Sequence, residues 1–163
     1  NNNAFTNMVV RETFAIANAV VGHLRQHRPE ALAALLRKLD IEPELAGFTD
    51  AAARLYVPAP DPVTGVIEQF EGYFKLRDVS VEELKTKMVH PNEYFGASQG
   101  LAVPTKVIKQ ADVVMMLELF QSRFPAAIKQ ANWGGYKEWF LADQQAPIAV
   151  RKIYEEVEGK LPR

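Results

Sequence analysis

Two neighbouring polar side chains in a mostly apolar stretch are the residues of this chain best suited to do chemistry. Lys109 and Gln110 lie between two apolar pairs, Val107-Ile108 and Val113-Val114. The apolar spacing of this stretch predicts a helix from about residue 105 to 120. Burying a Lys side chain away from water costs several kcal/mol of free energy unless its ammonium group is paired with a partner. A neighbouring Gln amide can both donate and accept hydrogen bonds. Aimed into a cavity, the pair would recognise a hydroxyl-rich ligand such as a sugar, whereas on a solvent-facing helix surface it would have no such role.

Composition excludes several other functions. The 163 residues suffice for one domain with a core, and 48% hydrophobic with 24% charged residues is ordinary for a globular protein. The 19 basic and 20 acidic residues nearly cancel, which argues against a nucleic-acid or membrane partner. The absence of Cys excludes disulfides, a thiolate nucleophile and a Cys-bound metal, and fits a reducing compartment such as the cytoplasm. No apolar run approaches the ~20 residues that span a bilayer.

Helices are expected to position the Lys-Gln pair. Apolar periodicity predicts a long helix from about Thr6 to His27. Pro29 suits the first turn of a second helix, whose buried stripe would be formed by four leucines: Leu32, Leu35, Leu36 and Leu39. Asp50 can cap a short helix that ends at Leu55.

The second half of the chain alternates loops and short elements. Prolines and the Asp61-Pro62 turn signal predict a loop from 57 to 65, and Ser80 with Glu83 forms a capping box that starts a short helix. The other expected elements are a short strand at 66–70, an irregular segment at 90–104, and helices at about 125–132 and 147–158 separated by Gly134-Gly135.

Three segments carry a resemblance to a known family. They are Asn2-Asn3-Ala4-Phe5-Thr6-Asn7, Thr64-Gly65-Val66-Ile67-Glu68-Gln69-Phe70-Glu71-Gly72-Tyr73-Phe74, and Val107-Ile108-Lys109-Gln110-Ala111-Asp112-Val113-Val114. In this order they resemble motifs of glycoside hydrolase family 65, the maltose, trehalose and kojibiose phosphorylases and their relatives. The resemblance covers about residues 1–136 and implies a partial catalytic domain. Residues 137–163 would then be a divergent helical segment.

The resemblance implies a fold as well as an activity. Catalytic domains of this family are (α/α)6 toroids, so we expect a mainly α chain that forms part of such a toroid, with helical hairpins and long loops. Twelve helices of ~11 residues with loops of ~5 residues need upwards of ~190 residues. This chain also has long loops, so it would supply about half of the toroid.

The implied reaction is inverting phosphorolysis of an α-glucosidic disaccharide to β-glucose 1-phosphate and a sugar. Lys109 and Gln110 match the family's glucose-holding pair and would be the substrate-binding residues. The family's catalytic Glu lies just before the Asn-Asn motif, so it is expected upstream of Asn1 and no catalytic residue is assigned in this chain. The chain lacks an initiator Met, and we expect it to begin within a longer sequence and to be inactive alone. The resemblance implies no cofactor, inorganic phosphate as co-substrate, a disaccharide or glucose as ligand, and a homodimer as one possible assembly of the complete enzyme.

The expected phosphate site departs from the family pattern. The family has a His followed by paired serines after a Tyr-bearing segment, but here residues 132–136 match that segment loosely and residues 137–143 contain neither His nor Ser. Phosphate-binding residues are therefore not carried over. Two alternatives stay open, a hydrolase of the same fold and an inactive sugar-binding or structural helical fragment.

Other side chains favour structural roles. Glu93 lies in a loop whose order in the chain does not match the family's catalytic motif, and Glu68 and Glu71 suit packing or supporting roles. Asp112 is either a solvated acid or locally paired. His23 and His27 share a helix face without an evident third ligand, so no metal site is expected. Four aromatic residues could stack on sugar rings but more often form core: Tyr73, Phe74, Trp133 and Trp139.

Overall fold

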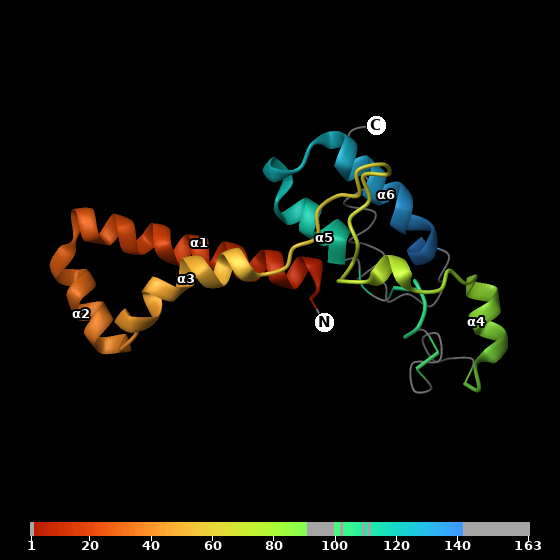
Figure 1. The fold of residues 1–163 in the computed structure, drawn as a ribbon, viewed down its shortest axis with the longest axis horizontal. Coiled ribbons are helices and arrows are strands. Elements are labelled where there is room, and N and C mark those ends of the chain that lie inside the picture. The colour runs from red at the N-terminus through yellow and green to blue at the C-terminus, as the bar shows by residue number, and fades with distance from the viewer. Residues whose placement is uncertain (1, 91–99, 102, 109, 111, 142–163) are drawn as a thin grey trace.

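The computed structural model describes residues 2–90, 100–101, 103–108, 110 and 112–141 (Figure 1). Over this part the chain is mainly α, as predicted, and its β pairing consists of two isolated bridges, Asn3 with Phe70 and Arg77 with Thr105. Within the described residues, short 3-10 turns lie at Tyr73–Lys75 and Gln121–Arg123. The helices are α1 (Ala4–His27), α2 (Pro29–Leu39), α3 (Glu42–Arg54), α4 (Val81–Lys87), α5 (Asp112–Leu119) and α6 (Ala126–Leu141).

The first three helices form an arm that extends to one side of the other elements (Figure 1). The predicted helix to His27 is confirmed, and α1 begins where the Asn3 side chain accepts a hydrogen bond from the Thr6 amide. Pro29 opens α2 as expected. Along the arm α1 packs against α3, with the rings of Phe14 and Phe48 5.0 Å apart.

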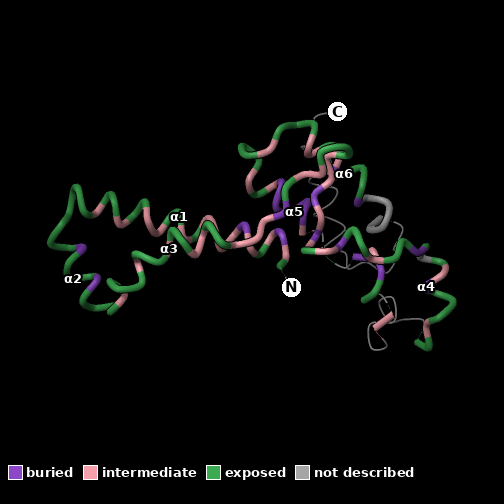
Figure 2. Tube along the Cα trace, viewed as in Figure 1, coloured by how far each residue is buried: buried purple, intermediate pink, exposed green. Residues whose placement is uncertain are grey.

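Buried residues concentrate where the start of α1 meets α5 and α6, while the arm is largely exposed (Figure 2). The core is made of the following residues: Ala4, Met8, Ile67, Tyr73, Ile108, Val113, Val114, Met116, Leu117, Trp133 and Tyr136. In the expected leucine stripe of α2, Leu32 and Leu36 are buried, but Leu35 and Leu39 are 39% and 49% exposed. The stripe prediction is therefore half right.

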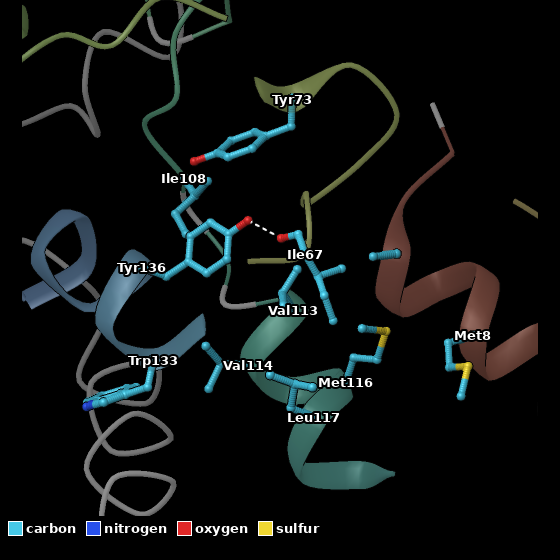
Figure 3. Packing of buried hydrophobic residues seen from close by; sticks show 11 residues of the cluster. Met8, Ile67, Tyr73, Ile108, Val113, Val114, Met116, Leu117, Trp133 and Tyr136 are labelled. Carbon is cyan, nitrogen blue, oxygen red and sulfur yellow. Dashed lines mark hydrogen bonds between the residues drawn. The ribbon is translucent and has the colours of Figure 1, made fainter. Parts of the chain in front are cut away.

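A buried polar residue of α6 forms hydrogen bonds to the loop at residues 65–67. Asn132 is fully buried, and its Oδ1 accepts from the Ile67 amide at 2.7 Å. Its Nδ2 donates to the carbonyls of Gly65 and Ile128 at 2.9 and 2.8 Å. The Tyr136 hydroxyl donates to the Ile67 carbonyl, the contact drawn in Figure 3. These bonds satisfy backbone groups that would otherwise be buried without partners.

Those bonds also explain why the strand expected at 66–70 is absent from the structure. The amide and carbonyl of Ile67 are used by side chains of α6. Within the expected strand, Phe70 pairs with Asn3 in a single antiparallel bridge. By contrast, the loop from 57 to 65 and the Ser80 cap of α4 are confirmed, and Ser80 Oγ accepts from the Glu83 amide at 3.0 Å.

Three expected helix boundaries are wrong. The short helix expected at Asp50–Leu55 begins at Glu42, because a proline in the first turn and acidic residues near the positive helix end favour that earlier start. α6 continues through Gly134-Gly135, since buried residues on both sides of the glycines hold it in place. The helix expected from residue 105 begins at Asp112.

The late start of α5 has a local cause. The amide of Lys106 donates to the carbonyl of Arg77 at 2.9 Å, and the amide of Arg77 donates to the carbonyl of Pro104 at 3.1 Å. The Tyr73 hydroxyl donates to the Lys106 carbonyl at 2.6 Å. The carbonyls of Pro104 and Lys106, which would accept hydrogen bonds within a helix, are thus bonded to Arg77 and Tyr73 instead.

Two expected segments cannot be compared with the described part of the structure. The helix expected at 147–158 and most of the irregular segment at 90–104 lie outside the described residues. Among the helices that the structure describes, none combines the length and apolar character required to cross a membrane.

Candidate functional site

The three motifs found in the sequence meet at one place in the fold. The segment at 69–70 and the segment that leads into α5 line a cavity of about 340 Å³, and the segment that starts α1 is hydrogen-bonded to both motifs, at Glu71 and Asp112. It is lined by apolar, amide and carboxylate side chains: Gln69, Phe70, Val107, Ile108, Gln110 and Asp112. The composition of this lining, apolar walls with a few polar groups, is typical of small-molecule sites.

Gln69 connects all three segments and is only 3% exposed. Its Nε2 donates to the carbonyl of Gln110 at 3.1 Å, and its Oε1 accepts from the amide of Val113 at 3.0 Å. Its own carbonyl accepts from the amide of Ala4 at 2.9 Å. The side chain therefore holds the backbone on both sides of Asp112, the first residue of α5.

A second connection joins the two helix starts directly. Asn3 uses Oδ1 to accept from the Thr6 amide at 2.9 Å, which caps α1. Its Nδ2 donates to Asp112 Oδ2 at 2.7 Å. Asp112 was expected to be either a solvated acid or paired with a nearby group, and in the structure it is paired, with Asn3.

The two nearby glutamates have structural partners. Glu71 Oε2 accepts from Asn2 Nδ2 at 2.7 Å. Glu68 accepts from the Tyr56 hydroxyl at 2.6 Å and from the Gly72 amide at 3.1 Å. The hydrogen bond to Glu68, together with burial and the neighbouring negative charges, raises the pKa of Tyr56 to about 12. Both carboxylates thus serve the supporting roles expected of them.

Of the two predicted substrate-binding residues, Gln110 lines the cavity and has an exposed side chain, while Lys109 lies outside the described residues. Gln110 precedes α5 and is not part of a helix. Sequence reasoning missed Asn3 and Gln69 as organisers of the site. The available signal was that Gln69 stands as a polar residue between Ile67 and Phe70, within a recognised motif.

The candidate sugar-stacking aromatics divide into core and surface. Tyr73 and Trp133 are buried in the core (Figure 3), and burial raises the pKa of Tyr73 well above its ordinary value. Phe74 is 42% exposed and lines a second cavity of about 420 Å³ with Tyr136 and Lys106. The side chain of Trp139 lies outside the described part of the chain.

The remaining candidates provide no further chemistry in the part of the chain that the structure describes. The rings of His23 and His27 stack 4.6 Å apart on α1. Within the described residues, no three His, Cys, Asp or Glu side chains come together to hold a metal ion. Glu93 lies outside that part of the chain.

The three motifs are thus joined by hydrogen bonds beside one cavity, and comparison with known proteins identifies the family. A family model described as the glycosyl hydrolase family 65 central catalytic domain matches residues 1–150. This chain belongs to glycoside hydrolase family 65. The family membership inferred from the three motifs is thereby confirmed.

Curated family 65 relatives resemble this chain over most of its length. Nigerose phosphorylase of Lachnoclostridium phytofermentans is 40% identical over 137 residues, which cover 84% of this chain and 18% of that protein. 1,2-alpha-glucosylglycerol phosphorylase of Bacillus selenitireducens is 31% identical over 138 residues, with coverage of 83% and 18%. This chain therefore spans about a fifth of the length of the curated relatives that it matches.

A family 65 fold is also found by structural comparison. A solved structure of a candidate kojibiose phosphorylase from the human microbiome superposes with a TM-score of 0.76 at 22% identity, covering 99% of this chain and 20% of the other. Together with the mainly helical architecture, this confirms the expected fold class, part of an (α/α)6 toroid.

Proposed function

We propose that this chain is part of a longer family 65 enzyme that performs inverting phosphorolysis of an α-glucosidic disaccharide. Inorganic phosphate is the co-substrate, and the products are β-glucose 1-phosphate and a second sugar. The proposal is supported by the relatives, since proteins that are 40% and 31% identical to this chain are named phosphorylases of nigerose and of 1,2-alpha-glucosylglycerol.

In this proposal Lys109 and Gln110 hold the glucose unit at the cavity of about 340 Å³. The observation that carries it is that two family motifs line this cavity, with Gln110 among the lining residues, while the third motif is hydrogen-bonded to both. A Lys donates to sugar hydroxyls as a point charge, and the Gln amide adds a directional donor and acceptor. Apolar contact with Val107 and Ile108 would accommodate the less polar faces of the ring.

The catalytic glutamic acid is proposed to lie upstream of Asn1 in the longer enzyme, a few residues before the Asn-Asn motif. The start of α1 is bonded to two residues of the cavity lining, through Asn3 to Asp112 and through the Ala4 amide to Gln69, so a residue a few positions ahead of it would lie near a sugar bound there. Such an acid would protonate the departing glycosidic oxygen while phosphate attacks the anomeric carbon from the opposite face. On this proposal the isolated chain lacks the acid and is inactive.

No residue of this chain is assigned to phosphate binding. Asn132 and Tyr136, in the segment that resembles the approach to the family's phosphate site, are committed to backbone groups at 65–67. The groups that bind phosphate are proposed to come from other parts of the longer enzyme.

The test is turnover by the longer enzyme of nigerose, kojibiose, maltose and trehalose, each with and without inorganic phosphate. We expect glucose 1-phosphate to form only when phosphate is present, with the β configuration seen by proton NMR, and no turnover by the isolated chain. Release of free glucose at equal rates with and without phosphate would instead indicate the hydrolase. Glucose 1-phosphate formed by the isolated chain would overturn the assignment of the acid upstream of Asn1. An enzyme that binds these sugars and cleaves none would be the sugar-binding alternative.

A further inference from the structure

We propose that Asn3 and Asp112 are positioning residues for the reaction. Their hydrogen bond sets the place of the chain segment ahead of α1 relative to the segment that leads into α5. This inference rests on the proposed function, in which the first segment carries the acid and the second carries the glucose-holding pair. Neither residue is proposed to touch the substrate.

The first argument is the double use of the Asn3 amide. Its Oδ1 caps α1 through the Thr6 amide at 2.9 Å, and its Nδ2 donates to Asp112 at 2.7 Å. Asp, Ser or Thr would cap a helix about as well as Asn. None of these has an oxygen acceptor together with an amide donor in one short side chain. The pairing with Asp112 is thus a reason for Asn rather than another capping residue at position 3.

The second argument is the place of Asp112. It is the first residue of α5, where a negative charge interacts favourably with the helix dipole. The carboxylate therefore belongs at this helix start even without Asn3. By accepting from Asn3 it also joins the starts of two helices that are 109 residues apart in sequence.

The third argument is a parallel connection through Gln69. The residue after Asn3, Ala4, donates its amide to the Gln69 carbonyl at 2.9 Å. The residue after Asp112, Val113, donates its amide to Gln69 Oε1 at 3.0 Å. Two adjacent residues at each helix start are thus held: Asn3 and Asp112 bond to each other, and Ala4 and Val113 bond to the backbone and side chain of the buried Gln69. This double connection restricts both sliding and rotation of α1 against α5.

The expected effect is on the rate of the chemical step. If α1 shifts, an acid ahead of it moves away from the glycosidic oxygen, and a misplacement of ~1 Å can reduce a rate about 100-fold. Gln110 lies on the α5 side of the connection and keeps its own support from Gln69. Substrate binding should therefore change less than turnover.

The test is Asn3→Asp in the longer enzyme. Asp keeps the helix cap, but it brings a second carboxylate against Asp112. At neutral pH we expect kcat to fall about ten-fold or more while KM changes less than about three-fold. As the pH is lowered the two carboxyl groups can share a proton, so the ratio of variant to wild-type kcat should rise. Glu71, which accepts from the neighbouring residue Asn2, is a further carboxylate near position 3, and its negative charge favours that shared proton.

The rescue variant exchanges the two side chains. Asn3→Asp combined with Asp112→Asn restores one donor and one acceptor, and it moves the charge from one helix start to another. We expect kcat within about two-fold of wild type and no recovery at low pH. The matched control is Asn18→Asp on α1, where Asn18 donates to Thr49 Oγ1 at 3.1 Å and a carboxylate can accept from that hydroxyl. Its kinetics should equal those of wild type.

Wild-type kcat in Asn3→Asp at every pH, or an exchange variant as slow as the single variant, would overturn the positioning role. A wild-type enzyme that turns over no α-glucoside would overturn the proposed function and the positioning role together. The pairing itself is judged separately by Tm, which should fall in Asn3→Asp and recover in the exchange variant. Equal Tm in the wild type, Asn3→Asp and the exchange variant would show that the Asn3–Asp112 hydrogen bond does not stabilise the fold.

Discussion

Gln69 and Gln110 are joined by a hydrogen bond of 3.1 Å from the side-chain Nε2 of the first to the backbone carbonyl of the second. The bond uses the backbone of Gln110, an exposed residue that lines the cavity. A buried residue thereby fixes the backbone of an exposed one. This division of roles separates the residue that would bind the sugar from the residue that orients it.

Gln69→Glu is expected to break this hydrogen bond while keeping the one from Val113. The carboxylate can still accept from the Val113 amide, but its second oxygen would face the carbonyl of Gln110 without a proton between them. The free energy of unfolding should fall by about 2 kcal/mol or more at neutral pH, since a buried polar group loses its partner. Urea unfolding measures the change. Gln121→Glu, an exposed position, should stay within about 0.5 kcal/mol of wild type.

Lys109→Ala and Gln110→Ala are each expected to lower kcat/KM of the longer enzyme by several-fold or more. Each substitution removes hydrogen-bonding groups that would contact the glucose unit, and the loss in kcat/KM reports transition-state binding. Steady-state kinetics of phosphorolysis measures it. Lys129→Ala, a change of the same kind on α6 and away from the cavity lining, provides the control. Wild-type kinetics in both site variants would remove them from the proposed glucose subsite.

The same substitution should have opposite effects at two glycines. Gly65 has φ of +73°, and an added Cβ would lie 3.3 Å from the Ala131 Cβ, so Gly65→Ala should destabilise the protein by about 1–2 kcal/mol. Gly134 lies inside α6 with nothing within 4 Å of an added Cβ. Gly134→Ala should therefore stabilise the protein by about 0.5–1 kcal/mol. Thermal unfolding of both variants checks the sign of each change.

The Tyr56–Glu68 hydrogen bond predicts a dependence of stability on alkaline pH. The pKa of Tyr56 is raised from 10.0 to about 12 in the folded state. A raised pKa means that the folded protein holds this proton more tightly than the unfolded chain does. The contribution of this hydrogen bond to the free energy of unfolding is therefore complete below about pH 10, and it is lost as the pH rises towards about 12.

Unfolding of the wild type and of Tyr56→Phe, measured across this alkaline range, tests the effect. The stability advantage of the wild type should be constant below about pH 10 and should shrink between pH 10 and about 12. Glu68→Gln keeps an acceptor but removes the charge, so the Tyr56 hydroxyl should titrate closer to its ordinary value in that variant. A difference between wild type and Tyr56→Phe that does not vary with pH would contradict the raised pKa.

Elements with local signals were predicted well from the sequence. The amphipathic run of α1, Pro29 at the start of α2, and Ser80 ahead of α4 act within one or two helical turns, and all three predictions are confirmed. Gly134-Gly135 was expected to end a helix because glycine lowers helix propensity. The buried contacts of Asn132 and Tyr136 outweigh that cost, and they depend on residues 65–67, far away in sequence.

The assignment of Lys109 and Gln110 to a sugar site stays a prediction, and only part of the local geometry followed from the sequence. Gln110 lines a cavity, whereas apolar spacing alone suggested that the pair stood within a helix. That spacing could not reveal the bonds between Arg77 and the segment at 104–106, which hold this stretch in a non-helical form. The link between Asn3 and Asp112 is likewise invisible to any local pattern, because each residue looks like an ordinary helix-start residue.

The length of α1 has a consequence for how the molecule opens. Its first turns carry Ala4 and Met8, which are buried, whereas Ile16 and Val20 farther along are 62% and 48% exposed. Regions with few buried contacts open locally at a lower free energy than the core does. Backbone amides near Met8 should then exchange with solvent only when the whole core unfolds, while those beyond Ile16 exchange through fluctuations of the arm. One continuous helix thus contains a slowly exchanging end beside the candidate site and a rapidly exchanging end away from it.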